Sequence, residues 1–359
     1  MPPSSVHFNG SVNLPDAETV MREISKRIPR GVRRMTDGEP GERNYWIHFQ
    51  IEKFAAMPEF ESAGAPRDAY DTSGARGPAP AMPQLRLAEG VSPEAVKWPD
   101  LGYADAYRQS YELFCALQEA GTIPPGVRLQ MQYPTPLAPI AGTFIPEQIQ
   151  GVTASYAKAL FADLDKALAV LPHDRCAVQW DVAVEFGLLE GGFGPSAPLE
   201  QVAPGLVRCA DQVPDDVPVG MHLCYGDYGH QHFTQPDSLE MQVRVVNAVT
   251  EAARRPVNWF SFTVPQARSE ESYFAPLRDL QAGPETELYF ALVPYYPADQ
   301  SPGTTGEQVK LIDECLAQSP AGSREWGICT ECGMGRVVGE DVPGLLDVHR
   351  QILESYAPA

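Results

Sequence analysis

The sequence predicts an α/β protein that forms a single (β/α)8 (TIM) barrel. Short apolar runs, rich in β-branched and aromatic residues and ended by turn residues, alternate with longer amphipathic stretches. Alternation of strand and helix is typical of a parallel sheet, and eight such repeats are typical of a closed barrel. An open doubly wound sheet is the alternative, but no Gly-x-Gly-x-x-Gly motif follows any of the runs. The 359 residues suit one barrel, so we expect one domain spanning residues 1–359.

The predicted strands are the eight runs with the clearest strand composition and turn boundaries. In chain order they are Val6–Gly10, Val32–Asp37, Val127–Tyr133, Cys176–Asp181, Val217–Leu223, Asn258–Val264, Thr286–Val293 and Glu325–Cys329.

The predicted helices lie between these strands, and several begin with good capping residues, such as Asp16 after Pro15 and Ser238. In chain order they are Asp16–Ile28, Glu42–Phe54, Ala104–Glu119, Pro146–Val170, Leu199–Cys209, Leu239–Ala253, Ser269–Leu280, Gly306–Gln318 and Val342–Tyr356.

One segment interrupts the alternation between the second and third strands. Residues 57–100 are rich in Pro, Gly and Ala, with a short hairpin predicted around Pro83–Leu87. Long irregular insertions in compact domains are either functional covers or loops without structure of their own. We interpret this insertion as a lid over part of the barrel; a surface excursion without a role is the alternative.

Composition narrows the function classes. The formal charge of −20 disfavours nucleic acid as a partner, because an acidic surface repels phosphates. No apolar run is long enough to span a membrane, and the first residues do not resemble a secretory signal, so we expect a cytoplasmic protein. Seven irregularly spaced cysteines in such a chain are more typical of reduced thiols, some of them metal ligands, than of disulfides.

The sharpest chemical motif is His222-x-Cys224 at the end of the fifth predicted strand. Alternation along an extended chain places both side chains on one face, and imidazole and thiolate are good zinc ligands. Cys329-x-x-Cys332 follows the last strand, which a barrel brings near the fifth strand across its mouth. A redox pair is the alternative for these two cysteines, but no thioredoxin-like pattern accompanies them. We therefore expect a zinc site.

Polar residues recur at the ends of other predicted strands, where barrel enzymes carry their chemistry. Gly10 and Ser11 follow the first strand, and Tyr133 and Asp181 end the third and fourth. The second strand is followed by a segment that contains Asp37, Glu39 and Arg43.

These motifs, in this order, resemble the catalytic barrel of cobalamin-independent methionine synthase and its single-barrel relatives, such as epoxyalkane:coenzyme M transferase. The similar segments are Asn9-Gly10-Ser11-Val12, Asp37-Gly38-Glu39 with Glu42-Arg43-Asn44, Gln179-Trp180-Asp181, His222-Leu223-Cys224-Tyr225 and Cys332-Gly333.

The resemblance implies a zinc-dependent transferase that activates a small thiol for transfer of a methyl or epoxide-derived alkyl group. It implies that His222, Cys224 and Cys332 bind the metal, and that Gly10, Ser11, Glu39 and Asp181 hold the thiol substrate. The sequence departs from the methionine synthases at Pro265, which stands where they place a metal-binding Glu.

The loop after the metal pair adds two candidate catalytic residues. His230 and His232 follow Cys224 closely and are expected to overhang the pocket, where either can protonate a leaving oxygen. The alternative is a pair of surface histidines. Asp181 is the third candidate catalytic residue, and Asp37, Arg43 and Tyr133 are further candidates for substrate binding.

Two other enzyme classes remain open. One is a lyase or hydrolase that uses zinc as a Lewis acid on a carbonyl or epoxide, without a thiol. The other is a metal-free enzyme similar to uroporphyrinogen decarboxylase, in which Asp37, Arg43 and Arg33 or Arg34 handle an acidic substrate.

Overall fold

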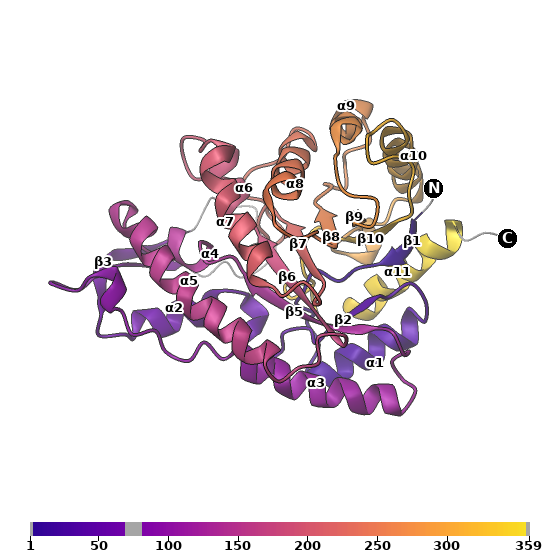
Figure 1. Ribbon diagram of the computed structural model, residues 1–359. Coiled ribbons are helices and arrows are strands. Elements are labelled where there is room, and N and C mark those ends of the chain that lie inside the picture. Colours follow the sequence, from indigo (N-terminus) through magenta and orange to yellow (C-terminus); the bar gives the residue numbers. More distant parts are fainter. Residues whose placement is uncertain (1–2, 69–80, 357–359) are drawn as a thin grey trace.

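The computed structural model describes residues 3–68 and 81–356, and its centre is one curled, eight-stranded parallel sheet (Figure 1). The strand order is β1-β10-β9-β8-β7-β6-β5-β2, and every pair of neighbours runs parallel. The strands are β1 (Pro3–Val6), β2 (Arg34–Thr36), β5 (Arg128–Pro134), β6 (Cys176–Val182), β7 (Val219–Leu223), β8 (Trp259–Phe262), β9 (Glu287–Val293) and β10 (Trp326–Thr330). All eight predicted strands are thus present in one sheet.

The first strand differs most from its predicted bounds, Val6–Gly10. It ends at Val6, although the backbone N–H of His7 still donates to the carbonyl of Ile328 on β10. Gly10 has a φ of 123°, which takes the chain out of the extended conformation and turns it over the end of the sheet.

Helices connect the strands and pack around the sheet (Figure 1). The α-helices are α1 (Ala17–Arg27), α2 (His48–Ala55), α3 (Tyr103–Glu119), α4 (Ala138–Ala141), α5 (Pro146–Leu168), α6 (Val184–Leu189), α7 (Leu199–Gln212), α8 (Glu240–Ala252), α9 (Glu271–Phe274), α10 (Pro302–Ala317) and α11 (Val342–Tyr356). Asp16 caps α1 as predicted, because its side chain accepts the backbone N–H of Thr19 at 2.7 Å.

Two predicted helices are broken. Glu42–Phe54 is divided into a 3-10 turn, η1 (Gly41–Tyr45), and α2, because Trp46 between them adopts a φ of 56°. Ser269–Leu280 is divided into α9 and η3 (Ala275–Asp279), where Pro276 stands at the start of the second piece. The short helices α4 and α6, which follow β5 and β6, were not predicted at all.

The two edge strands of the sheet approach each other. Val6 at the end of β1 forms a parallel bridge with Val32, and its backbone N–H donates to the carbonyl of Gly31 at 2.9 Å. Val32 lies just before β2, so the sheet curls until its first and last strands are neighbours at this point.

The insertion contains the predicted hairpin. β3 (Phe60–Arg67) pairs antiparallel with β4 (Met82–Leu87), and Leu85 also bridges to Phe144 near the start of α5. Residues 69–80 of the predicted lid lie outside the described residues. In the part of the chain that is described, no helix has both the length and the apolar character that crossing a bilayer requires.

Close packing at the sheet yields a stability prediction at Gly220 in β7. A Cβ there would lie 2.0 Å from the indole of Trp259 on β8, which is fully buried. Gly220→Ala should therefore lower the free energy of unfolding by about 1–3 kcal/mol through overpacking. Chemical denaturation measures the change. Gly303→Ala is the matched control in α10, because a Cβ at Gly303 has no neighbour within 4 Å; equal losses in both variants would contradict the packing at β7.

Candidate metal centre

Three side chains with metal-binding atoms meet where β7 ends and where the chain leaves β10. His222 is the fourth residue of β7, Cys224 follows the strand directly, and Cys332 lies two residues beyond β10. One ligand atom from each of the three lies within 4.8 Å of the others. The predicted convergence of the fifth and last strands of the barrel on one set of ligands is thus present in the structure.

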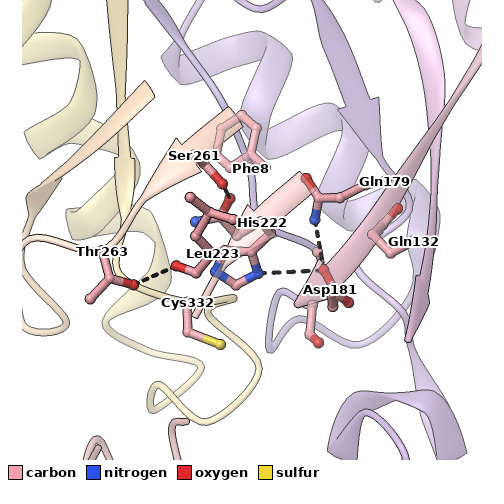
Figure 2. Close-up of polar contacts among 12 residues, drawn as sticks. Phe8, Gln132, Gln179, Asp181, His222, Leu223, Ser261, Thr263 and Cys332 are labelled. Carbon is pink, nitrogen blue, oxygen red and sulfur yellow. Dashed lines mark hydrogen bonds and ion pairs between the residues drawn. The ribbon is translucent and has the colours of Figure 1, made fainter. Parts of the chain in front are cut away.

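His222 is held between two polar partners. Its Nδ1 lies 3.4 Å from Oδ1 of Asp181 on β6 (Figure 2). Its Nε2 lies 3.1 Å from the carbonyl oxygen of Glu331. The same Asp181 oxygen accepts a hydrogen bond from the side-chain amide of Gln179 at 2.9 Å. Burial lowers the pKa of His222, but the hydrogen bond with Asp181 and the nearby Cys332 outweigh that effect and raise it overall.

The thiols of Cys224 and Cys332 share a hydrogen bond, which makes their pKa values differ. It raises the pKa of Cys224 well above the usual value, and burial acts in the same direction. The same bond lowers the pKa of Cys332 to about 7, and the positive charge of Arg336 contributes to that shift against the effect of burial. Arg336 Nη2 lies 3.5 Å from the Cys332 sulfur. Cys332 is therefore the thiol that ionises first.

The donor set and its spacing fit a tetrahedral zinc ion. Zinc–sulfur bonds of about 2.3 Å and zinc–nitrogen bonds of about 2.0 Å place neighbouring ligand atoms about 3.5–3.8 Å apart. The separations here are at most 4.8 Å, so modest side-chain adjustments bring all three atoms to one ion. Three protein ligands leave a fourth position, as in catalytic zinc sites. Cys329 is buried inside β10 and is not one of these three ligands.

A second layer of buried charges lies behind the ligands. Asp227 accepts hydrogen bonds from Arg336 and His230, both at 2.9 Å, and His232 pairs with Glu331 at 2.9 Å. Burial raises the pKa of Asp227, but Arg336 and His230 lower it by more. His230 also stacks on the ring of Tyr295 with centroids 4.0 Å apart. Each charge in this layer thus has an opposite partner.

Two acidic side chains, Glu39 and Asp181, line the same cavity as the three candidate ligands. Glu39 is buried and accepts a hydrogen bond from the Ser11 hydroxyl at 2.7 Å. Burial, with the negative charge of Asp181 second, raises the pKa of Glu39 to about 8. Glu39 therefore carries a proton at neutral pH.

Asp37 and Arg43 form an ion pair that holds the backbone of Glu39. Arg43 Nη2 donates to Asp37 at 2.7 Å, and both side chains are buried. The other oxygen of Asp37 accepts the backbone N–H of Glu39 at 2.9 Å, and Glu39 has a φ of 50°. This hydrogen bond holds Glu39 in a left-handed conformation that non-glycine residues rarely adopt.

The three candidate ligands, Glu39 and Asp181 border a cavity of about 440 Å³. Its polar end is formed by the three ligands with Ser11, Glu39, Asp181, Asp227, Tyr228 and Arg336. The hairpin of the insertion contributes Arg67, Asp68 and Met82 to the wall. Whether the hairpin closes over substrate, as a lid would, stays a prediction.

Several predicted site residues do not line this cavity. Gly10 sits between Glu39 and Gln132, where a Cβ would be 3.2 Å from the Glu39 carboxylate. Tyr133 is buried on the side of β5 that faces the helices, and its hydroxyl donates to Asp163 at 3.1 Å. The remaining four are also absent from the cavity wall: Asp37 and Arg43 support Glu39, and His230 and His232 belong to the layer of buried charges behind the ligands.

The structure adds residues that were not predicted. Arg336 and Asp227 line the cavity as a buried ion pair, and Tyr228 lines it with its hydroxyl 2.5 Å from Nε2 of His48. Burial and the charge of Arg336 lower the pKa of His48 to about 4, so that this imidazole is neutral near pH 7. Only the position of Asp227 and Tyr228 directly after His222-x-Cys224 pointed to them in the sequence.

No known family matches the sequence, and no curated protein is significantly similar to it. The resemblance to cobalamin-independent methionine synthase is therefore carried by the short motifs alone.

Proposed function

We propose that this protein is a zinc-dependent transferase that alkylates a small thiol. The observation that carries the proposal is the convergence of His222, Cys224 and Cys332, with ligand atoms within 4.8 Å, on the wall of a cavity large enough for a small substrate. When bound, zinc supplies Lewis acidity, which favours the thiolate form of a substrate thiol over the thiol.

The transfer itself is a nucleophilic substitution. An electron pair on the substrate sulfur forms the new bond to carbon, while the bond between that carbon and its leaving group breaks and its electron pair stays with the leaving group. The proton lost by the thiol ends on the leaving group. Glu39, which carries a proton at neutral pH, and Asp181 line the cavity and are positioned to bind the thiol substrate and to hold protons.

The carboxylates favour a thiol that bears an amino group. Glu39 and Asp181 both line the cavity, and the charge of Asp181 raises the pKa of Glu39. A nearby ammonium group would be attracted to the negative charge of this pair. Ser11, beside Glu39, adds a hydroxyl to this end of the site.

We also infer that the curled sheet is a closed (β/α)8 barrel. The bridge between Val6 and Val32 joins the two edge strands, and the Thr36 hydroxyl donates to the carbonyl of Gly10 at 2.8 Å. Closure accounts for the approach of the ends of β7 and β10, which the metal ligands need.

The contacts of the basic residues disfavour the metal-free alternative. Arg33 and Arg34 lie at the start of β2 and pair with Glu287, away from the cavity that holds Glu39 and Asp181. Arg43 is paired with Asp37. The Lewis-acid alternative is separated from the thiol transferase by experiment.

Cobalt substitution tests the proposal directly. A protein that binds about one zinc per chain should accept Co²⁺, and thiolate ligands give cobalt a sulfur-to-metal charge-transfer band. Adding homocysteine should strengthen this band, whereas homoserine, with a hydroxyl in place of the thiol, should not. A band that neither compound changes, in a protein that does bind metal, would favour the Lewis-acid enzyme. Absence of bound metal would overturn the proposal.

A prediction for the Asp181 carboxylate follows from its contact with the His222 ring. Asp181→Asn keeps the shape of the side chain but removes the charge that orients and polarises the imidazole, so zinc affinity should fall by about 10–100-fold. Competition with a chromophoric chelator measures the affinity. His230→Ala is the matched control, because His230 contacts Asp227 and not a ligand. Equal losses in the two variants would contradict the role of Asp181.

A further inference from the structure

We infer that the alkyl donor is an uncharged, largely apolar molecule whose body binds on an apolar wall of the cavity that holds the metal ligands. This inference rests on the proposed transferase function. The wall, here called the apolar wall, is formed by Leu137, Ile149, Val184, Leu188, Phe193 and Phe233. It belongs to the same cavity as the three ligands, so a molecule bound there can place one end near the thiol.

The apolar wall is built by the segments that follow β5, β6 and β7. Leu137 directly precedes α4, Ile149 is in the second turn of α5, and Val184 and Leu188 lie on α6. All four side chains are only partly buried, although the sheet beside them is fully buried. Helical residues that keep apolar surface open to a cavity can recover the hydrophobic free energy of burial when an apolar ligand enters.

Phe193 gives the wall an exposed aromatic edge. Its side chain is 40% exposed, one of three large hydrophobic residues so exposed in the described part of the chain. The ring lies 5.0 Å from that of Phe233 and packs so closely on Gly187 that a Cβ there would be 2.2 Å away. The backbone thus holds Phe193 at the cavity, where its free face suits an apolar or aromatic group.

The charges on the cavity wall disfavour an anionic donor. Among the described residues, four acidic side chains line it, those of Glu39, Asp68, Asp181 and Asp227, and of these Glu39 carries a proton at neutral pH. In the described part of the chain, the arginines of the wall are Arg67, which is exposed next to Asp68, and Arg336, whose charge is balanced by Asp227 at 2.9 Å. Apart from the proposed metal ion, a donor with several carboxylates would therefore meet acidic side chains without a set of unpaired cations among the described residues.

A matched pair of fluorescent probes tests the inference. N-phenyl-1-naphthylamine is neutral, and 8-anilinonaphthalene-1-sulfonate carries the same rings with one added sulfonate. The neutral probe should bind saturably at about one site per chain, and the sulfonate should bind at least about tenfold more weakly. Equal affinities, or no saturable binding of the neutral probe, would overturn the inference.

Two variants test whether the neutral probe binds at the apolar wall. Leu188→Asp adds a charge to the wall and should weaken binding of the neutral probe at least about tenfold. Phe193→Ala removes an exposed ring without disturbing the core and should weaken it less, in the same direction. Val170→Asp is the control, because Val170 is 60% exposed beyond the end of α5 and does not line the cavity. Unchanged binding in both wall variants would place the probe elsewhere and overturn the inference.

Zinc content and the cobalt response to homocysteine are measured on the same preparations. They distinguish failure of the apolar-donor inference from failure of the transferase proposal. Normal metal and thiol responses without binding of the neutral probe would overturn only the apolar donor. Binding of the probe at the apolar wall without metal or thiol responses would overturn the transferase and leave an apolar binding site.

Discussion

Cys224→Ser should reduce the zinc content from about one ion per chain to less than about one-tenth. A serine hydroxyl remains protonated at neutral pH and is a poor zinc ligand, so the site would keep only His222 and Cys332 from the protein. The thiols of this site also contact each other, through the hydrogen bond that lowers the pKa of Cys332. Elemental analysis after gel filtration measures the loss.

Cys329→Ser is the informative control for this experiment. Cys329 lies three residues before Cys332 in the Cys-x-x-Cys motif, but it is fully buried inside β10 and has an elevated pKa because of that burial. This variant should keep its zinc. Loss of zinc from Cys329→Ser but not from Cys224→Ser would mean that the ion is bound by the Cys-x-x-Cys pair, and would contradict the ligand assignment.

The strands and the shared site of His222 and Cys224 were predictable because each depends on a local pattern. Apolar runs ended by turn residues predicted all eight strands, and the two-residue alternation at His222 and Cys224 predicted that both would reach one site. The choice of Cys332 as the third candidate ligand came from the resemblance, whereas the predicted barrel topology placed only the ends of the fifth and last strands near each other.

The layer of buried charges behind the ligands and the apolar wall both depend on tertiary contacts that no local pattern reveals. Arg336 meets Asp227 across more than one hundred positions of the sequence. The short helices α4 and α6 have too few residues for a helical period to be recognised, yet they carry much of the apolar wall. The expected place of His230 and His232 over the pocket came from sequence proximity alone, and the structure instead pairs them with Asp227 and Glu331.

Arg43→Met should lower the free energy of unfolding by about 3–5 kcal/mol, the largest stability effect that we expect at the site. Asp37 is fully buried and accepts hydrogen bonds from Arg43 and from the Ser110 hydroxyl, both at 2.7 Å. Without the guanidinium, its charge would stay buried without a cation, which costs more than the ion pair contributes. Chemical denaturation with Arg86→Met as control measures the effect. The exposed pair of Arg86 and Glu61 should contribute less than about 1 kcal/mol.

The same substitution connects the fold to the chemistry of the cavity. Asp37 holds the backbone of Glu39 in its left-handed conformation, and the charge of Arg43 lowers the pKa of Glu39 against the effects of burial and Asp181. In Arg43→Met the pKa of Glu39 should therefore rise further above 8.

Asp37→Asn combined with Arg43→Met removes the uncompensated charge, so the double variant should be more stable than Arg43→Met alone. If both are equally destabilised, the loss comes from packing of the Arg43 side chain against Tyr107 and not from the buried charge.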